Sequence, residues 1–368
     1  MKTATQIVRS ASVQTAVFSL FALCAVTLAQ TTPTILPLLP PSVSTVPPNG
    51  DVNPYGVVFA PKNVPAGRGL HGGDILVSNF NNAQNLQGRG STIVRVDRTG
   101  AVSTFYTASS SRVGMTAALG VLSDGLVLAG NLPTADGTSA TVQPGQLSVL
   151  DSFGNFLGTF GTLATIDGPW GMAIRDIGNG TAGTANVFVS NVLSGVVSRF
   201  DVNYTAASIG ATALVLADNF NHRTDPAALV LGPSGLAYNA PNDTLYVASS
   251  SDNAVYAIPA ATAPHSAPVA PTLVFQDFTH LHGPLGLQIL PNGHFLIANS
   301  DGSNADPNQP SELVEFTSTG QFIAQMTLDP NNGGAFGVGV SNLGWGAVRI
   351  ATVDDNTNRL NISTAVIP

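Results

Sequence analysis

One unit recurs six times along this chain of 368 residues, and the repeat constrains the fold more than any other feature. Each copy opens with a turn that ends in glycine and leads into an apolar strand. Successive openings are 64, 51, 64, 51 and 51 residues apart, as read from Gly56, Gly120, Gly171, Gly235, Gly286 and Gly337. These separations suit a four-stranded sheet with a few long loops.

A second expected strand follows each opening and ends on a small polar residue. The six end residues are Asn79, Asn131, Asn191, Ser249, Asn299 and Thr352. A third, alternating strand follows in every copy, and a fourth follows in the first five. Each complete copy therefore predicts one four-stranded β-sheet.

The sixth copy runs out near Pro368 before a clear fourth strand. The segment SVSTVPP at 42–48 resembles AVSTFY at 101–106, the fourth strand of the first copy, in sequence and position. We therefore expect residues 42–48 to supply the missing outer strand and to remove an open sheet edge. The predicted fold is all-β: a six-bladed β-propeller of four-stranded blades over 42–368, closed by an N-terminal strand.

The N-terminal 29 residues have the pattern of an export signal. Lys2 and Arg9 precede an apolar run at 16–28, and Ala29 is a suitable cleavage position. The single cysteine, Cys24, lies in this run, so cleavage leaves no thiol for a disulfide or a zinc site. A Pro/Thr-rich lead-in at 30–41 follows. We expect a secreted or periplasmic monomer that does not insert into a membrane after cleavage.

Charge excludes nucleic acid as a partner. Without Lys2 and Arg9, 13 − 2 = 11 basic residues face 21 acidic ones, a net charge of about −10. Only 9% of all residues are charged. Anionic membrane surfaces are excluded on the same ground.

The repeat resembles that of NHL-repeat propellers and of the wider TolB-like six-bladed group. The segment GPSGLAYNAPNDTLYVASSSDNAVYAI at 232–258 is also similar to gluconolactonases and senescence-marker-type lactonases. That resemblance implies a divalent metal in the central channel, held by a first-blade glutamate with Asn and Asp residues. The chain departs from the pattern, because Tyr55 stands at the first opening and the only glutamates are Glu312 and Glu315.

The ends of the second strands are the first candidate site. We expect Asn79, Asn131, Asn191, Ser249 and Asn299 to form a polar collar at one mouth of the channel, where amide oxygens can bind a polar ligand or a hard cation. The alternative is structural, with each side chain bonded to loop backbone.

The histidines give a second candidate site. His280 and His282 alternate in an extended segment, and Asp277 lies three residues before them. His222 and Asp225 lie in the loop before the fourth opening, which we expect on the same face. The His-x-His pair with a nearby Asp predicts a metal or acid–base site, and the cation, Ca²⁺ or Zn²⁺, would lie in the central channel between the Asn collar and these histidines. The alternative is loop-anchoring or solvated histidines. The segment 301–312 fails as an EF-hand, because Asp306 replaces the glycine of the turn.

Two functions follow from these features. The first is a binding module that uses the long loops 79–91, 131–144, 219–231 and 299–311 to hold a protein, peptide or glycan. The second is a metal-dependent hydrolase or lyase, similar to lactonases and esterases, with its site at the channel mouth. Sequence favours the binding module, because the carboxylates of the lactonase pattern are missing.

Overall fold

The computed structural model describes residues 34–36, 41–206 and 208–366, all in the unit Pro33–Pro368. These residues form six four-stranded antiparallel sheets and one two-stranded sheet. The predicted signal at 1–29, with Cys24, lies outside the described residues. Within the described part, no helix is long and apolar enough to cross a membrane. Its helices are the short 3-10 segments η1 (Ser139–Thr141) and η2 (Ala240–Asn242).

The first three four-stranded sheets each use four consecutive strands. Sheet 1 contains β2 (Val52–Phe59), β3 (Ile75–Asn81), β4 (Thr92–Val96) and β5 (Val102–Thr107). Sheet 2 contains β6 (Met115–Val121), β7 (Val127–Asn131), β8 (Gln146–Leu150) and β9 (Phe156–Phe160). Sheet 3 contains β10 (Pro169–Asp176), β11 (Ala182–Asn191), β12 (Val196–Thr205) and β13 (Ser208–Ala217).

The remaining strands complete the pattern. Sheet 4 contains β16 (Pro233–Asn239), β17 (Thr244–Ser249), β18 (Ala254–Pro259) and β19 (Thr272–Gln276). Sheet 5 contains β20 (Pro284–Ile289), β21 (Phe295–Asn299), β22 (Ser311–Phe316) and β23 (Phe322–Asp329). Sheet 6 contains β24 (Ala335–Gly344), β25 (Ala347–Asp354), β26 (Arg359–Val366) and β1 (Ser42–Ser44). A separate hairpin pairs β14 (Arg223–Asp225) with β15 (Leu229–Leu231).

Sheet 6 joins the two ends of the described chain. Its outermost strand is β1, which pairs antiparallel with β26 so that Ser42 lies opposite Asn361. The Arg359 guanidinium donates hydrogen bonds to the Ser42 hydroxyl (2.7 Å) and to the Ser42 carbonyl (2.8 Å). The N-terminal segment thus supplies the strand that the sixth copy lacks.

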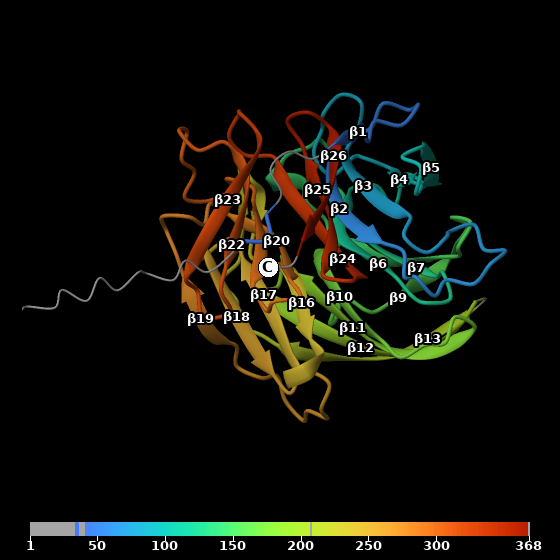
Figure 1. Ribbon diagram of the computed structural model, residues 1–368. Helices are drawn as coiled ribbons and strands as arrows, with labels where there is room; N and C mark the ends of the chain where they lie inside the picture. The colour runs from blue at the N-terminus through green and yellow to red at the C-terminus, as the bar shows by residue number, and fades with distance from the viewer. Residues whose placement is uncertain (1–33, 37–40, 207, 367–368) are drawn as a thin grey trace, which may run out of the picture. The chain divides into compact units, whose positions relative to one another are not determined.

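The first strand of every sheet lies on the inside. The strands β2, β6, β10, β16, β20 and β24 contact one another in this order, and β24 contacts β2 again. Figure 1 shows these strands near the centre, with β5, β13, β19 and β23 towards the outside. The repeat therefore places each opening motif around one central channel.

A β-bulge recurs at each opening motif. The register between first and second strands shifts at the same place in all six sheets, as between Pro169 and Gly171 in sheet 3. Proline suits this position because it has no N–H to offer the ladder. The bulge turns the strand next to the glycine, which lets neighbouring first strands approach each other.

The repeat glycine is required by this close approach. A Cβ at Gly171 would lie 2.1 Å from the Ser234 carbonyl oxygen of the next sheet, and one at Gly337 would lie 2.1 Å from that of Tyr55. Real Cβ atoms do not come so near another backbone, so a side chain would force adjacent sheets apart.

The second copy departs from the sequence alignment. Gly120 pairs with Leu128, three residues before Asn131, whereas Gly171 pairs with Ser190, one residue before Asn191. The longer bulge in β6, between Met115 and Leu119, accounts for this offset. Gly120 is therefore not the structural equivalent of the other repeat glycines.

Apolar side chains fill the spaces between neighbouring sheets. Ile35 of the lead-in is 2% exposed and packs with Leu296, Leu313 and other core residues of sheets 5 and 6. The buried Glu315 carboxylate accepts hydrogen bonds from the Thr34 hydroxyl (2.6 Å) and the Ile35 N–H (2.8 Å). The described part of the lead-in is therefore anchored on sheet 5.

We predict that Gly171→Ala destabilises the fold by about 1–3 kcal/mol, because its Cβ meets the Ser234 carbonyl. Gly210→Ala on β13 is the matched control, since a Cβ there meets no atom within 4 Å. Urea unfolding of both variants measures the difference. Equal stability of the two variants would show that the glycine spacing does not hold the sheets together.

Candidate functional site

The predicted collar side chains are buried, and all but that of Ser249 are bonded to loop backbone. Asn79, Asn131, Asn191, Ser249 and Asn299 are at most 1% exposed. The Asn131 amide donates to the Val113 carbonyl (2.9 Å) and accepts from the Gln146 N–H (2.9 Å). These contacts are of the kind that the structural alternative predicted, and a role for the collar in ligand binding stays a prediction.

The other collar side chains make similar contacts. The Asn191 amide oxygen accepts from the Asp167 N–H (2.9 Å), and that of Asn299 accepts from the His282 N–H (3.1 Å). Ser249 donates to the Asp252 carboxylate (2.7 Å). Among the five predicted collar residues, the Asn79 amide oxygen is the one buried oxygen without a partner in the described part of the chain.

The sixth collar position is Asp354 rather than Thr352. Asp354 pairs with Ala335, just as Asn79 pairs with Pro54 and Asn191 with Pro169. Thr352 pairs with Val338, further along the strand. The bulge between Ala335 and Val338 hides this offset from a sequence alignment.

The two predicted histidines turn in different directions. His280 Nδ1 lies 2.9 Å from the Asp277 carboxylate, and its ring stacks on Phe322 with centroids 3.9 Å apart. His282 Nδ1 lies 2.6 Å from the Asn304 carbonyl, and its buried Nε2 has no partner. The structure therefore joins His280 to Asp277 but does not bring His282 to the same point.

His222 and Asp225 also stay apart from this pair. The His222 ring contacts the Phe220 carbonyl (3.0 Å), while the Asp225 carboxylate accepts from the Ala227 N–H (2.9 Å). No three His, Cys, Asp or Glu side chains in the described part of the chain gather as a metal would require. Three collar amide oxygens already accept a backbone hydrogen bond, and the unpartnered collar oxygens are those of Asn79 and Asp354. Two free oxygens are fewer than the about six to eight that Ca²⁺ takes, so the collar alone does not fit the lactonase-type cation. A cation in the channel stays a prediction.

The rings of Tyr55, Phe80, Trp170 and Phe336 pack together at the centre of the channel, and we call this cluster the aromatic plug. The ring centroid of Tyr55 lies 4.5 Å from that of Phe336, 4.7 Å from that of Phe80 and 5.3 Å from that of Trp170. Tyr55, Trp170 and Phe336 each directly precede a repeat glycine, so the repeat itself brings them to the channel axis. Tyr55 of the plug stands at the first opening, where the resemblance to lactonases implies a metal-binding glutamate.

A cavity of about 160 Å³ lies on the collar side of the plug. Tyr55, Trp170 and Phe336 form part of its wall, and Ser300 and Asp301 follow the collar residue Asn299 into it. The β14–β15 hairpin contributes Ala227, Ala228, Val230 and Leu231 to the same wall. The loop 219–231, expected to bind a partner, therefore partly packs over the plug.

Three polar side chains of this wall have no hydrogen-bond partner among the described residues. They are the Asp301 carboxylate, whose two oxygens are buried, the Tyr55 hydroxyl and the amide of the half-buried Gln87. The two serine hydroxyls of the wall are occupied, since Ser300 donates to the Gly283 carbonyl (2.7 Å) and Ser250 to that of Gly232 (3.1 Å). Unpaired buried oxygens such as those of Asp301 are costly, which marks this cavity as a candidate ligand site.

Burial sets the protonation of these groups. It raises the pKa of Asp301, and the nearby Gly333 amide only partly offsets this rise. Burial also raises the pKa of the Tyr55 hydroxyl, and the Asp355 carboxylate adds to the effect. Tyr55 is therefore a neutral donor at any physiological pH. Perturbed groups in a cavity are typical of functional sites.

Glu312 does not line this cavity but is close enough to Asp301 to feel its charge. It is 1% exposed, accepts a hydrogen bond from the Asn299 amide (2.9 Å) and keeps its second oxygen unpartnered. Burial raises the pKa of Glu312 to about 7, against the opposing effect of the Asn299 hydrogen bond. The neighbouring Asp301 charge adds to the rise.

Sequence reasoning did not place Asp301 and Tyr55 together. They are far apart in the chain, and Asp301 drew attention only through a failed EF-hand match. A usable signal was present in the repeat, where an aromatic residue before the glycine recurs at positions 55, 170 and 336.

Comparisons with known proteins give the fold. No family model and no curated protein sequence matches the chain. Among solved structures, a gluconolactonase from Xanthomonas campestris is similar at 12% identity with a TM-score of 0.53, covering 91% of this chain and 98% of that chain. A calcium-binding regucalcin from Agrobacterium tumefaciens covers 90% and 97%, at 12% identity and a TM-score of 0.48.

A luciferin-regenerating enzyme has 10% identity and a TM-score of 0.47, covering 89% of this chain and 95% of that chain. At these identities the gluconolactonase likeness shows the fold alone: the chain is an all-β protein with a β-propeller fold. This agrees with the resemblance to lactonase-type propellers. The NHL-repeat and TolB-like resemblances stay predictions.

We predict that Glu312→Gln stabilises the protein at pH 8 by about 1 kcal/mol and leaves it unchanged at pH 4. A pKa of about 7 in the fold lies above the ordinary value, so the native state binds the proton more tightly. Stability is therefore lost as the pH rises from about 4 to 7. Urea unfolding across this pH range measures the effect.

Glu315→Gln is the matched control on the same strand. The Glu315 carboxylate accepts hydrogen bonds from Thr34 and Ile35 and lies 2.6 Å from His294 Nδ1, so its loss should destabilise the protein at pH 8. A Glu312→Gln variant that is less stable than the parent at pH 8 would contradict the assignment of Glu312 as an uncompensated buried acid.

Proposed function

We propose that the chain hydrolyses small lactones or esters in the collar-side cavity. The observation that carries this proposal is the unpartnered Asp301 carboxylate, which lines the cavity together with the free Tyr55 hydroxyl and Gln87 amide. A volume of about 160 Å³ is about five times the space that a water molecule occupies. It suits one small ring better than a peptide or a glycan chain.

The three groups suit acyl hydrolysis. Asp301 takes a proton from a water molecule as that water attacks the carbonyl carbon. The neutral Tyr55 hydroxyl donates a hydrogen bond to the carbonyl oxygen as negative charge develops there. The ring C–O bond then breaks, and Asp301 returns the proton to the leaving alkoxide. One water is consumed and one hydroxy acid is formed.

The surroundings favour these roles. The raised pKa of Asp301 makes its carboxylate a stronger base than an exposed one. The aromatic wall of Tyr55, Trp170 and Phe336 keeps bulk water from the floor of the cavity. The fold shared with a gluconolactonase supports a lactone as substrate.

The finer architecture belongs to the same proposal. We infer that the six sheets are six blades of a ring, which β1 closes as the outer strand of the last blade. The pairing of β1 with β26 and the circular order of contacts among first strands support this inference. Export to the periplasm or the exterior, as a monomer, stays a prediction.

The rival function is the binding module on the loop face. It stays a prediction, with a protein, peptide or glycan as partner. Part of its expected surface is unavailable, because Leu229, Val230 and Leu231 of the loop 219–231 are at most 3% exposed. A protein that binds such a partner and hydrolyses no lactone would favour this rival.

We predict that Asp301→Asn lowers kcat/KM for glucono-δ-lactone hydrolysis by about 100-fold or more. Tyr55→Phe should lower it by about 100-fold, the usual effect of losing one oxyanion donor. The parent rate should rise with pH through the raised pKa of Asp301 and then level off, because the base acts only when ionised. A pH-stat assay with full-length protein measures both effects.

Asp306→Asn is the matched control in the same loop. The Asp306 carboxylate accepts a hydrogen bond from the Asn308 N–H (2.9 Å) and does not line the cavity. This variant should keep its rate within about twofold of the parent. The proposal is wrong if the parent does not exceed the spontaneous rate with any lactone or ester in a panel, or if Asp301→Asn behaves like Asp306→Asn.

A further inference from the structure

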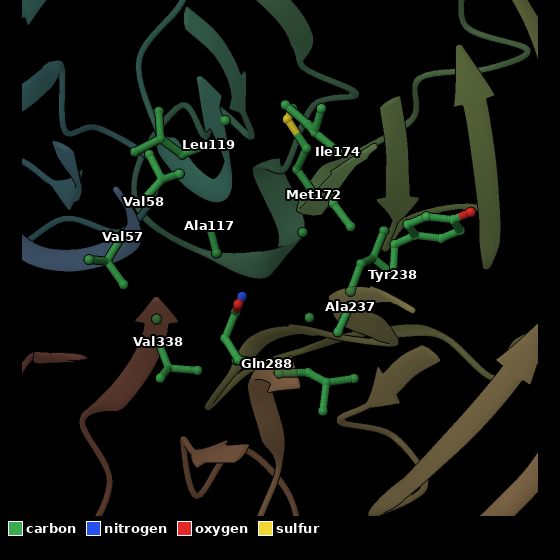
Figure 2. Close-up of a pocket in the computed structure, with 18 of the residues that line it drawn as sticks. Val57, Val58, Ala117, Leu119, Met172, Ile174, Ala237, Tyr238, Gln288 and Val338 are labelled. Atoms are coloured by element: carbon green, nitrogen blue, oxygen red, sulfur yellow. The ribbon is translucent and has the colours of Figure 1, made fainter. Parts of the chain in front are cut away.

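A second cavity occupies the channel on the other side of the plug. Its volume is about 320 Å³, twice that of the collar-side cavity. All six first strands contribute to its wall, for example through Val57, Leu119, Met172, Ala237 and Val338. Figure 2 shows these side chains around a common space.

The plug separates the two cavities along the strands. Tyr55, Trp170 and Phe336 line the collar-side cavity, whereas the residues that follow them, such as Val57, Met172 and Val338, line the second one. Val58, Met172 and Ile174 are half-buried, so this cavity is open to solvent at the ends of the first strands away from the collar. Binding of a molecule in this second cavity therefore does not require the Asp301 carboxylate, which does not line it.

The wall is uncharged. No Asp, Glu, Lys, Arg or His side chain lines the second cavity among the described residues. The Tyr238 hydroxyl is occupied, because it donates to the Asp243 carboxylate (2.9 Å). An ion in this cavity would therefore lose its hydration without gaining a counter-charge.

Backbone edges supply hydrogen-bonding groups to this wall. Each first strand is at the edge of its sheet and pairs with a second strand on one side only. Its other edge faces the channel with no strand partner among the described residues. Some of these backbone groups are bonded to hydroxyls, as the Gly171 N–H is to Ser190 and the Gly337 carbonyl is to Thr352. The remaining N–H and C=O groups need water or a ligand.

One polar side chain projects into the same space. Gln288 lies on β20, is half-buried and makes no side-chain hydrogen bond to another described residue. Figure 2 shows its amide in the space between Val57, Ala117 and Ala237. An amide both donates and accepts, like the backbone groups around it.

We propose that this cavity binds a neutral polyol of about the size of a hexose. A hydroxyl group both donates and accepts, which matches a wall of mixed backbone groups and one amide without charge. The aliphatic side chains then contact the C–H surface of the ligand. The cavity holds about ten water molecules, and the ligand would displace ordered water as its hydroxyls replace those hydrogen bonds.

Calorimetric titration of the full chain with myo-inositol and with methyl α-glucoside tests this site. The parent protein should bind at least one of them in a saturable way, and glucuronate, the charged relative, at least tenfold more weakly. Gln288→Leu should weaken binding by about tenfold, since one hydrogen bond to the ligand is lost. Gln288→Phe should abolish binding by filling the channel.

Gln325→Leu is the matched control, on the outermost strand β23 of the same sheet. Gln325 is exposed, and its amide donates to Gln309 (3.2 Å) outside the channel. This variant and Asp301→Asn should bind the polyol like the parent, and Gln288→Leu should keep any lactone hydrolysis. The two proposals can thus fail separately.

Two results would overturn the polyol site. One is the absence of saturable binding by the parent with both probes. The other is equal binding by Gln288→Phe, Gln325→Leu and the parent, which would place the polyol elsewhere on the molecule.

Discussion

The close approach of neighbouring first strands is the constraint on which the rest of the structure depends. At Gly171 and Gly337 the next strand's carbonyl oxygen occupies the space that a side chain would need. The bulge beside each glycine makes the approach possible, and the proline found in four of the six openings tolerates the missing ladder bond. Five such contacts, at Gly56, Gly171, Gly235, Gly286 and Gly337, help to bring the sheets around one channel.

The residue before the glycine then decides what the channel contains. Because Tyr55, Trp170 and Phe336 meet at the axis, the channel is divided into two cavities of different character. The collar-side cavity holds a buried carboxylate with raised pKa, and the opposite one holds an uncharged wall with the Gln288 amide. Their chemistry is therefore expected to be independent.

The sequence predicted the β-sheets more completely than it predicted the candidate site. The four-strand unit and the strand at 42–44 were readable, because turns and alternation are local signals. The alignment of the repeats placed the sixth collar position at Thr352, two residues before Asp354, and treated Gly120 as equivalent to the other repeat glycines. Both errors arise because a β-bulge changes the strand register and no sequence pattern shows where it does so. The pairing of Asp301 with Tyr55 depends on contacts between distant blades, and no local pattern predicts it.

A crystal structure of the protein soaked with a non-hydrolysable lactam analogue of its lactone substrate tests the central claim most directly. The account predicts density for the lactam over Tyr55 and Trp170, with a polar atom within hydrogen-bond distance of the Asp301 carboxylate. Density only in the cavity around Gln288, only on the outer loops, or nowhere at saturating lactam would contradict it.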